Sequence, residues 1–230
     1  MLNGRCQVLH LGLVDYENGL ELQERLVQER KLGQRPDTLV LLQHPPVVTI
    51  GRRGDPDNIL VPLESLTREG IAVHEASRGG DVTYHGPGQL VGYPILRLAD
   101  HGNDVYRYLR MLEEAVMLFL KGYGIRAEQQ PGYTGVWIGR DKVAAIGVAV
   151  KGGVTMHGFA LNVDPNLEHF RLIHPCGYTD RWVTSMAAQL GHKLDFEAVQ
   201  RAFPQSFGEV FGARMVAEGP TSQVARSHGL

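Results

Sequence analysis

The most regular pattern in the chain is residues 142–163, KVAAIGVAVKGGVTMHGFALNV. It contains two apolar runs rich in β-branched residues, 143–150 and 154–163, each long enough to be a strand. The Gly152-Gly153 pair between them is typical of a tight hairpin turn. We therefore predict an antiparallel hairpin of two long strands.

Helices and further strands are expected on both sides of this hairpin. Short apolar runs that stop at turn residues predict strands over 7–14, 38–42, 47–50, 71–76 and 90–98. Capping residues and helical spacing predict three main helices, beginning at Asp15, at Asn103 or Asp104, and at Asp195, and Pro204 is expected to kink or break the last one. Residues 77–88 are expected to form a loop. Without strict alternation of strands and helices, the pattern favours an α+β fold with a mixed sheet, in one domain over residues 1–215, followed by a flexible tail over 216–230.

Charge and cysteine content limit the class of protein. The 230 residues carry 23 basic and 25 acidic side chains, which argues against a protein held to nucleic acid or to a membrane by bulk charge. There are only two cysteines, Cys6 and Cys176, which do not make a disulfide framework. The first twenty residues lack the pattern of a secretory signal. We expect a cytoplasmic protein, a monomer, with neither nucleic acid nor a membrane as its partner.

Glycine is unusually frequent and unevenly placed. The chain has 28 glycines, well above the ordinary share of about 7%, and 16 of them fall in residues 79–177. Five lie in residues 79–92, where the sequence RGGDVTYHGPGQ begins at Arg78. This segment is neither a phosphate-binding P-loop nor a dinucleotide fingerprint. Glycines would let its backbone pack along a ligand, so ligand contact is favoured over a plain β-rich turn region.

Cys176 is the first candidate for chemistry. It lies between Pro175 and Gly177, a turn setting, whereas Cys6 lies close to the N-terminus. A thiol is a useful nucleophile only as the thiolate, which needs a nearby cation, base or helix N-terminus. From these residues alone, a nucleophile and a buried structural cysteine remain equally supported for Cys176.

Two side chains are candidates to activate this thiol. His174 is only two residues away, but a residue at that spacing often points elsewhere. Lys142 opens an apolar strand, and apolar surroundings disfavour the ammonium of a lysine, so that its pKa falls and the neutral amine can accept a proton. A solvated lysine at a strand end is the commoner alternative, and spacing does not place Lys142 beside Cys176. The ten histidines form no metal-binding motif, so neither a metal nor another cofactor is expected.

Four segments together resemble the lipoyl(octanoyl) transferases, members of the biotin/lipoate-protein ligase superfamily. They are residues 78–94, 142–147, 157–162 and 175–177, in that order along the chain. The resemblance covers about residues 7–210 and implies a mixed β-sheet with flanking helices, similar to the catalytic domain of the biotin and lipoate ligases. It implies transfer of an octanoyl group from octanoyl-acyl carrier protein to a lysine of a lipoyl domain, in lipoate biosynthesis.

The resemblance also assigns roles to residues. Cys176 matches the family's acyl-thioester nucleophile, and Lys142 matches the partner that lowers the pKa of that thiol. The residues that match the family's acyl-substrate contacts are Arg78, Gly79, Gly80, Asp81, Val82, Thr83, Tyr84, His85, Ala145, Ile146, Gly147, Gly158, Phe159 and Ala160. The implied acceptors are lipoyl domains of 2-oxoacid dehydrogenase complexes or the glycine cleavage H protein.

Two further expectations follow from this mechanism. Backbone N–H groups around Gly79-Gly80 or at Cys176-Gly177 are candidates to stabilise the tetrahedral oxyanion. Because the carrier proteins are usually acidic, basic patches are expected, with Arg52, Arg53, Arg78 and Lys151 as candidates. Two alternatives remain open: an ATP-dependent lipoate or biotin ligase of the same fold, and a non-catalytic module that binds a carrier protein.

Overall fold

The computed structural model describes residues 4–174 and 182–217. Within them, two sheets are present, one of eight strands and one of three. The larger sheet has the spatial order β11 (Arg214–Ala217), β1 (Arg5–Leu13), β2 (Asp37–Gln43), β6 (Gln89–Ile95), β10 (Val154–Asn162), β9 (Asp141–Lys151), β8 (Tyr133–Ile138) and β7 (Glu128–Gln130). The smaller sheet has the order β4 (Ala72–Glu75), β3 (Val47–Ile50) and β5 (Val82–His85). In the larger sheet β1 pairs in parallel with β2 and β11, and the other pairs are antiparallel, which confirms the mixed sheet.

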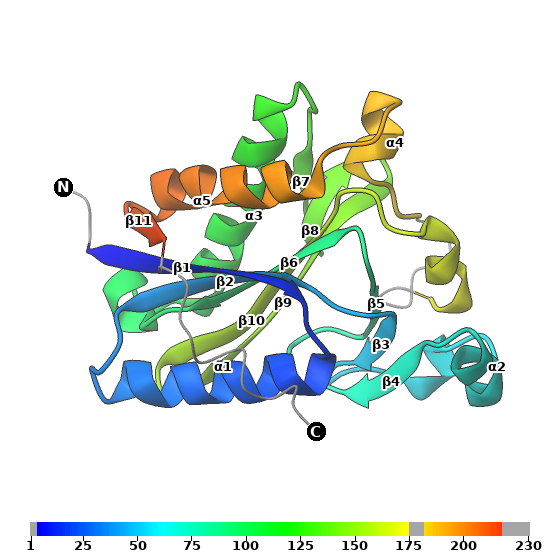
Figure 1. The fold of residues 1–230 in the computed structure, drawn as a ribbon, viewed down its shortest axis with the longest axis horizontal. Coiled ribbons are helices and arrows are strands. Elements are labelled where there is room, and N and C mark those ends of the chain that lie inside the picture. The colour runs from blue at the N-terminus through cyan, green and yellow to red at the C-terminus, as the bar shows by residue number, and fades with distance from the viewer. Residues whose placement is uncertain (1–3, 175–181, 218–230) are drawn as a thin grey trace.

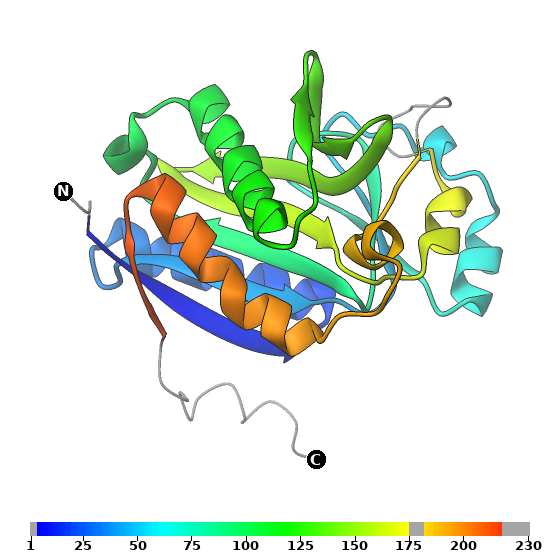
Figure 2. The same cartoon turned by 90° about the horizontal axis from the view of Figure 1, so that it is seen from above.

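Helices cover both faces of the larger sheet. In Figure 1, α1 (Tyr16–Lys31) lies below it, and α3 (Val105–Gly122) and α5 (Phe196–Phe211) lie above it. Figure 2 shows α3 and α5 crossing the upper face side by side. The remaining elements are short: α2 (Leu63–Arg68), α4 (Met186–Leu190), and the 3₁₀ turns at Pro56–Asn58, Leu98–His101 and Leu167–Leu172. This confirms the α+β class, with a mixed sheet and flanking helices.

Strand β2 shows why the central strands are apolar throughout. Leu39 and Leu41 point into the core beneath α3 and α5, whereas Val40 and Leu42 point into the core that packs on α1. A strand buried on both faces reads as a continuous apolar run rather than an alternating one. Residues 38–42 have this pattern because of the two helical layers.

Helix boundaries agree with the capping signals. The Asp104 carboxylate accepts hydrogen bonds from the amides of Tyr106 (2.8 Å) and Arg107 (3.2 Å), and Asp195 caps α5 in the same way. The prediction that Pro204 kinks or breaks α5 is wrong as to a break, because the helix continues to Phe211. The fully buried side chains of Phe203 and Phe207 flank the proline, and their packing offsets the lost backbone hydrogen bond.

The long hairpin forms as predicted, with β9 and β10 paired from Lys151 and Val154 onward and the two glycines at the turn. The expected loop over 77–88 is wrong in part, because residues 82–85 form β5, which pairs with β3 and is buried along its whole length. Val216 and Ala217, assigned to the tail, complete β11, and the rest of that tail, residues 218–230, lies outside the described residues. Among the helices described, none has the length and apolar character needed to cross a bilayer.

Candidate active site

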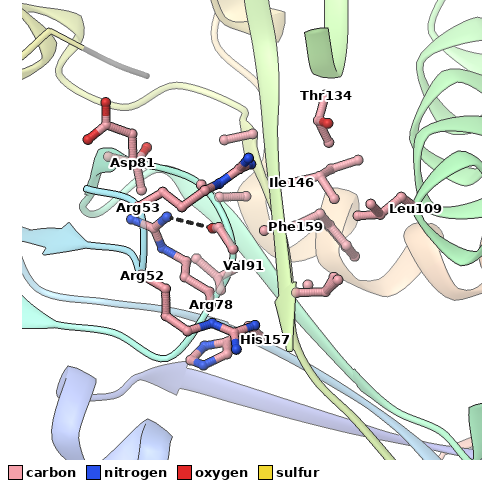
Figure 3. A pocket seen from close by; sticks show the side chains of 18 of the residues that line it. Arg52, Arg53, Arg78, Asp81, Val91, Leu109, Thr134, Ile146, His157 and Phe159 are labelled. Carbon is pink, nitrogen blue, oxygen red and sulfur yellow. Dashed lines mark hydrogen bonds between the residues drawn. The ribbon is translucent and has the colours of Figure 1, made fainter. Parts of the chain in front are cut away.

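A cavity of about 990 Å³ opens where the two sheets meet. Figure 3 shows many of its lining residues. The lining comes mainly from Arg52 and Arg53, the loop before β5, the strands β5, β6, β9 and β10, and the N-terminal part of α3, with Thr134 from β8. The volume is at the upper end of the range of about 300–1,000 Å³ that is typical of small-molecule sites.

The structure brings most of the predicted site residues together around this cavity. Those that line it are Arg78, Gly79, Gly80, Asp81, Val82, Thr83, His85, Lys142, Ala145, Ile146, Gly147, Gly158, Phe159 and Ala160. Tyr84 is not among the lining residues; it packs in the core of the smaller sheet, and its hydroxyl is 2.7 Å from Nδ1 of His169. Cys176 lies outside the described residues.

Lys142 is buried, with 6% of its surface exposed. The reading of a solvated strand-end lysine is therefore wrong. Its Nζ lies 4.7 Å from the centre of the Trp137 ring, a cation–π contact with a neighbouring strand. Lys142 is therefore an enclosed cation at the wall of the cavity.

The chain on the C-terminal side of Cys176 returns to Lys142. The Lys142 amide donates to the carbonyl of Trp182 (2.9 Å), and the Thr184 amide donates to the carbonyl of Lys142 (3.0 Å). On the N-terminal side, the His174 amide donates to the carbonyl of Asn58 (2.7 Å). Both residues that flank 175–181 are thus held by backbone hydrogen bonds, one of them at Lys142 itself.

Arg78 fixes the glycine-rich loop in place. The residue is buried, with 8% of its surface exposed. Its guanidinium donates to the carbonyl (2.7 Å) and hydroxyl (2.8 Å) oxygens of Thr49 on β3 and to the Gly79 carbonyl (3.1 Å). The loop lies between two glycines. A Cβ at Gly51 would be 2.5 Å from the Gly80 carbonyl oxygen, and one at Gly147 would be 2.9 Å from that of Gly79. Close backbone approach therefore accounts for both glycines.

Two proposed ligand contacts in this loop have structural partners. The Gly79 amide donates to the Val148 carbonyl (2.9 Å), so it is already engaged and is not a ready oxyanion donor. The Asp81 carboxylate accepts from the Asn58 side chain (2.7 Å) and from the amides of Asp55 (3.0 Å) and Val82 (2.8 Å). Asp81 therefore orders the 55–58 turn.

The cavity is positively charged although the chain is not. Among the described residues that line it, the cations are Arg52, Arg53, Arg78 and Lys142, and the acid is Asp81. Figure 3 shows Arg52 beside His157 and Arg53 reaching across the cavity. Lys151, the remaining basic candidate, instead pairs with Glu24 on α1 (3.0 Å). No three His, Cys, Asp or Glu side chains within residues 4–174 and 182–217 cluster in a way that would hold a metal.

Three buried histidines lie beside the cavity, and of these only His85 is among the predicted site residues. Burial lowers the pKa of His44 and of His157 to about 4, and that of His85 to about 3. Each ring has a polar neighbour: His44 contacts the Val14 carbonyl and the Tyr93 hydroxyl (both 2.6 Å), His85 contacts Gln89 (2.7 Å), and His157 contacts Ser77 (2.9 Å). His157 also has a φ of +55°, which is uncommon outside glycine and indicates a constrained position. His85 and His157 lie in segments that carry the family resemblance, whereas no sequence signal distinguishes His44 from the other histidines.

These rings make the stability of the fold depend on pH. A histidine in the unfolded chain takes up a proton near pH 6.5, whereas in the fold the three rings stay neutral to about pH 4. The unfolded state then binds more protons, so the free energy of unfolding is fully retained above pH 6.5 and falls as the pH drops towards 4. We expect a loss of roughly 1–2 kcal/mol per histidine between pH 7 and pH 5 in urea unfolding. In His44→Gln, unfolding at low pH should take up one proton fewer, so the free energy of unfolding should depend less on pH. Equal stability of the unaltered chain at the two pH values would contradict the prediction.

Comparisons with known proteins agree with this arrangement. Residues 15–208 match the family described as the lipoyl protein ligase A/B catalytic domain. A protein named octanoyltransferase from Caldicellulosiruptor saccharolyticus is 53% identical over 212 residues, covering 91% of this chain and 90% of that protein. Another of that name, from Chloroflexus aggregans, is 49% identical over 212 residues and covers 91% and 96%.

Solved structures share the fold at lower identity. A bipartite lipoate protein ligase from Thermoplasma acidophilum has a TM-score of 0.67 at 19% identity, over 96% of this chain and 89% of that one. A biotin protein ligase from Aquifex aeolicus, in complex with biotin and ATP, has a TM-score of 0.56 at 15% identity, over 89% and 70%. This chain is therefore an acyltransferase that belongs to the lipoyl protein ligase A/B catalytic-domain family, among the octanoyltransferases.

Proposed function

We propose that the chain transfers an octanoyl group from octanoyl-acyl carrier protein to a lysine of a lipoyl domain, through a thioester on Cys176. The observation that carries this proposal is the position of Lys142, which is buried at the cavity wall and hydrogen-bonded to the segment that follows Cys176. The names of the relatives support octanoyl transfer, and the octanoyl donor, the thioester and the acceptors are the proposal's own content.

The first half of the reaction acylates the enzyme. Lys142 takes the proton of the Cys176 thiol, and the resulting ammonium stabilises the thiolate, which attacks the thioester carbonyl of the donor. The tetrahedral intermediate collapses by breaking the bond to the carrier's sulfur, which leaves as a thiolate and takes the proton from Lys142, so that Lys142 is neutral again. One thioester is exchanged for another, so the free-energy change of the step is close to zero and no ATP is needed.

The second half transfers the acyl group to nitrogen. The acceptor lysine must be neutral to attack the Cys176 thioester, and in this proposal neutral Lys142 takes a proton from its ammonium or from the tetrahedral intermediate and passes it to the departing Cys176 thiolate. The products are an octanoyl amide and the free thiol. The proposed acceptors are the lipoyl domains of 2-oxoacid dehydrogenase complexes or the glycine cleavage H protein.

The cavity suits both substrates. Ala145, Ile146, Phe159 and Ala160 give it an apolar wall for an alkyl chain. The excess of arginines at the same cavity favours acidic carrier proteins.

The test is intact-mass analysis after incubation with octanoyl-acyl carrier protein and no ATP. We expect one octanoyl group on the unaltered chain and none on Cys176→Ser. Cys6 serves as an internal control in both proteins, because burial raises the pKa of its thiol to about 12 and leaves it unreactive.

The same assay separates the alternatives. An ATP-dependent ligase would form no adduct from the carrier and would release pyrophosphate with free fatty acid and ATP. A non-catalytic binding module would form no adduct, and Cys176→Ser would leave its function in cells unchanged. Either result would refute the thioester mechanism.

A further inference from the structure

Glu113 is a buried carboxylate that the mechanism above does not use. It lies on α3 with 0% of its surface exposed, among the core residues Leu112, Ala115 and Val116. Burying a carboxylate in an apolar core is unfavourable unless hydrogen bonds compensate for the lost water. One compensating contact is local: Arg110, one turn earlier, donates to Oε2 at 2.6 Å.

The second contact of Glu113 leaves its own helix. The Gly135 amide on β8 donates to Oε1 at 2.9 Å, and this hydrogen bond is buried. Glu113 therefore joins α3 to one point of β8. At that point the ladder between β8 and β9 is irregular, with a register shift between Val136 and Trp137, so strand pairing alone does not fix β8 there.

Gly135 is also the residue against which the Lys142 side chain packs. A Cβ at Gly135 would be 3.3 Å from Cε and 3.5 Å from Cδ of Lys142. Two residues further along the same strand, the Trp137 ring covers Nζ at 4.7 Å. Both Gly135 and Trp137 thus position Lys142 from β8, one against the alkyl stem and one against the ammonium.

We infer that Glu113 is a positioning residue for Lys142: its hydrogen bond to Gly135 sets the place of β8, and β8 sets the place of the lysine ammonium in the cavity. The inference rests on the proposed function, because it assigns Glu113 to the reaction only through Lys142. Glu113 itself touches neither the substrate nor the reacting thiol.

The experiment measures the rate of octanoyl adduct formation from octanoyl-acyl carrier protein between pH 6 and pH 9.5. In Glu113→Ala we expect the midpoint of the pH profile to rise by about one unit, which lowers the rate at pH 7 about tenfold. Glu113→Gln keeps an oxygen that can accept from the Gly135 amide, so it should restore most of the profile. Glu114→Ala is the matched control, since Glu114 is the next residue on α3 and is exposed.

A double variant tests the route through Lys142. If Glu113 acts on the reaction through the lysine, adding Glu113→Ala to Lys142→Met should cause no further loss of rate. Multiplicative losses, or a Glu113→Ala protein whose pH profile is unchanged while its thermal stability falls, would overturn the inference and leave Glu113 a purely structural residue.

Two further outcomes are a Glu113→Ala protein that does not fold and an unaltered chain that forms no adduct. If Glu113→Ala does not fold, Glu113→Leu replaces it, because leucine fills the buried space of the side chain but cannot accept the hydrogen bond from the Gly135 amide. The same rise in midpoint is expected, and an unchanged profile would overturn the inference. Failure of the unaltered chain to form any adduct would instead refute the proposed function, and this inference with it.

Discussion

Lys142→Met should slow octanoyl adduct formation about thirtyfold at pH 7. At pH 9.5, where the thiol ionises without help, most of the rate should return. A free cysteine has a pKa of about 8.5, so without a neighbouring cation only about 3% of Cys176 would be thiolate at neutral pH. Methionine has a similar length and is uncharged, so it fills the space between Gly135 and Trp137 without the ammonium. The measurement is the rate of mass increase with octanoyl-acyl carrier protein across the pH range.

The control for this variant is Lys151→Met. Lys151 lies on the same strand, but it is on the surface and pairs with Glu24, so its removal should leave the rate unchanged at every pH. If Lys142→Met and the unaltered chain share one pH profile, Lys142 does not control the thiol. A variant that stays inactive at high pH would point to a structural defect instead.

Gly158→Ala should cost the fold about 3 kcal/mol or more, the largest effect on stability that we expect from a single added methyl group. A Cβ at this position would lie 2.2 Å from the Gly92 carbonyl oxygen and 2.6 Å from Cδ of Pro94, so β10 would have to move away from β6. Both strands are central in the larger sheet, and displacing one disturbs the cores on both faces. The expected fall in melting temperature is about 10 °C.

Gly12→Ala is the control for this effect. Gly12 is also in a strand of the larger sheet, but no heavy atom lies within 4 Å of its added Cβ. Its melting temperature should change by less than about 2 °C. If Gly158→Ala has the same melting temperature as Gly12→Ala, the sheet accommodates the methyl group and the prediction is wrong.

Local patterns predicted the parts of the fold that local physics determines. The hairpin of β9 and β10 follows from two β-branched runs and a glycine pair, and α3 begins where an aspartate can cap it. β5 was missed because its four residues lie among five glycines, although their pairing with β3 buries all of them. The pairing partner is more than thirty residues away, and short-range spacing carries no information on it.

In the candidate site too, some residues could be nominated from the sequence, whereas their contacts depend on the fold. Spacing could nominate Lys142 and the glycine-rich loop, but the burial of Lys142 comes from Trp137 and from residues 182–184, which only the fold brings together. The roles of Gly51 and Gly147 likewise depend on a loop that passes between them. In the sequence, Glu113 is one of several charged residues within α3. Only its burial, which the fold creates, sets it apart from the exposed Glu114.

The edge of the larger sheet bears on the synthesis of the protein. β11 pairs in parallel with β1, so that residues 214–217 meet residues 5–8. On the ribosome, β1 emerges first, and this side of it stays unpaired until nearly the whole domain has been translated. Exposed strand edges promote association between chains, and contacts so distant along the sequence form slowly. Chaperone binding to the nascent chain should therefore persist until residues 214–217 have left the exit tunnel.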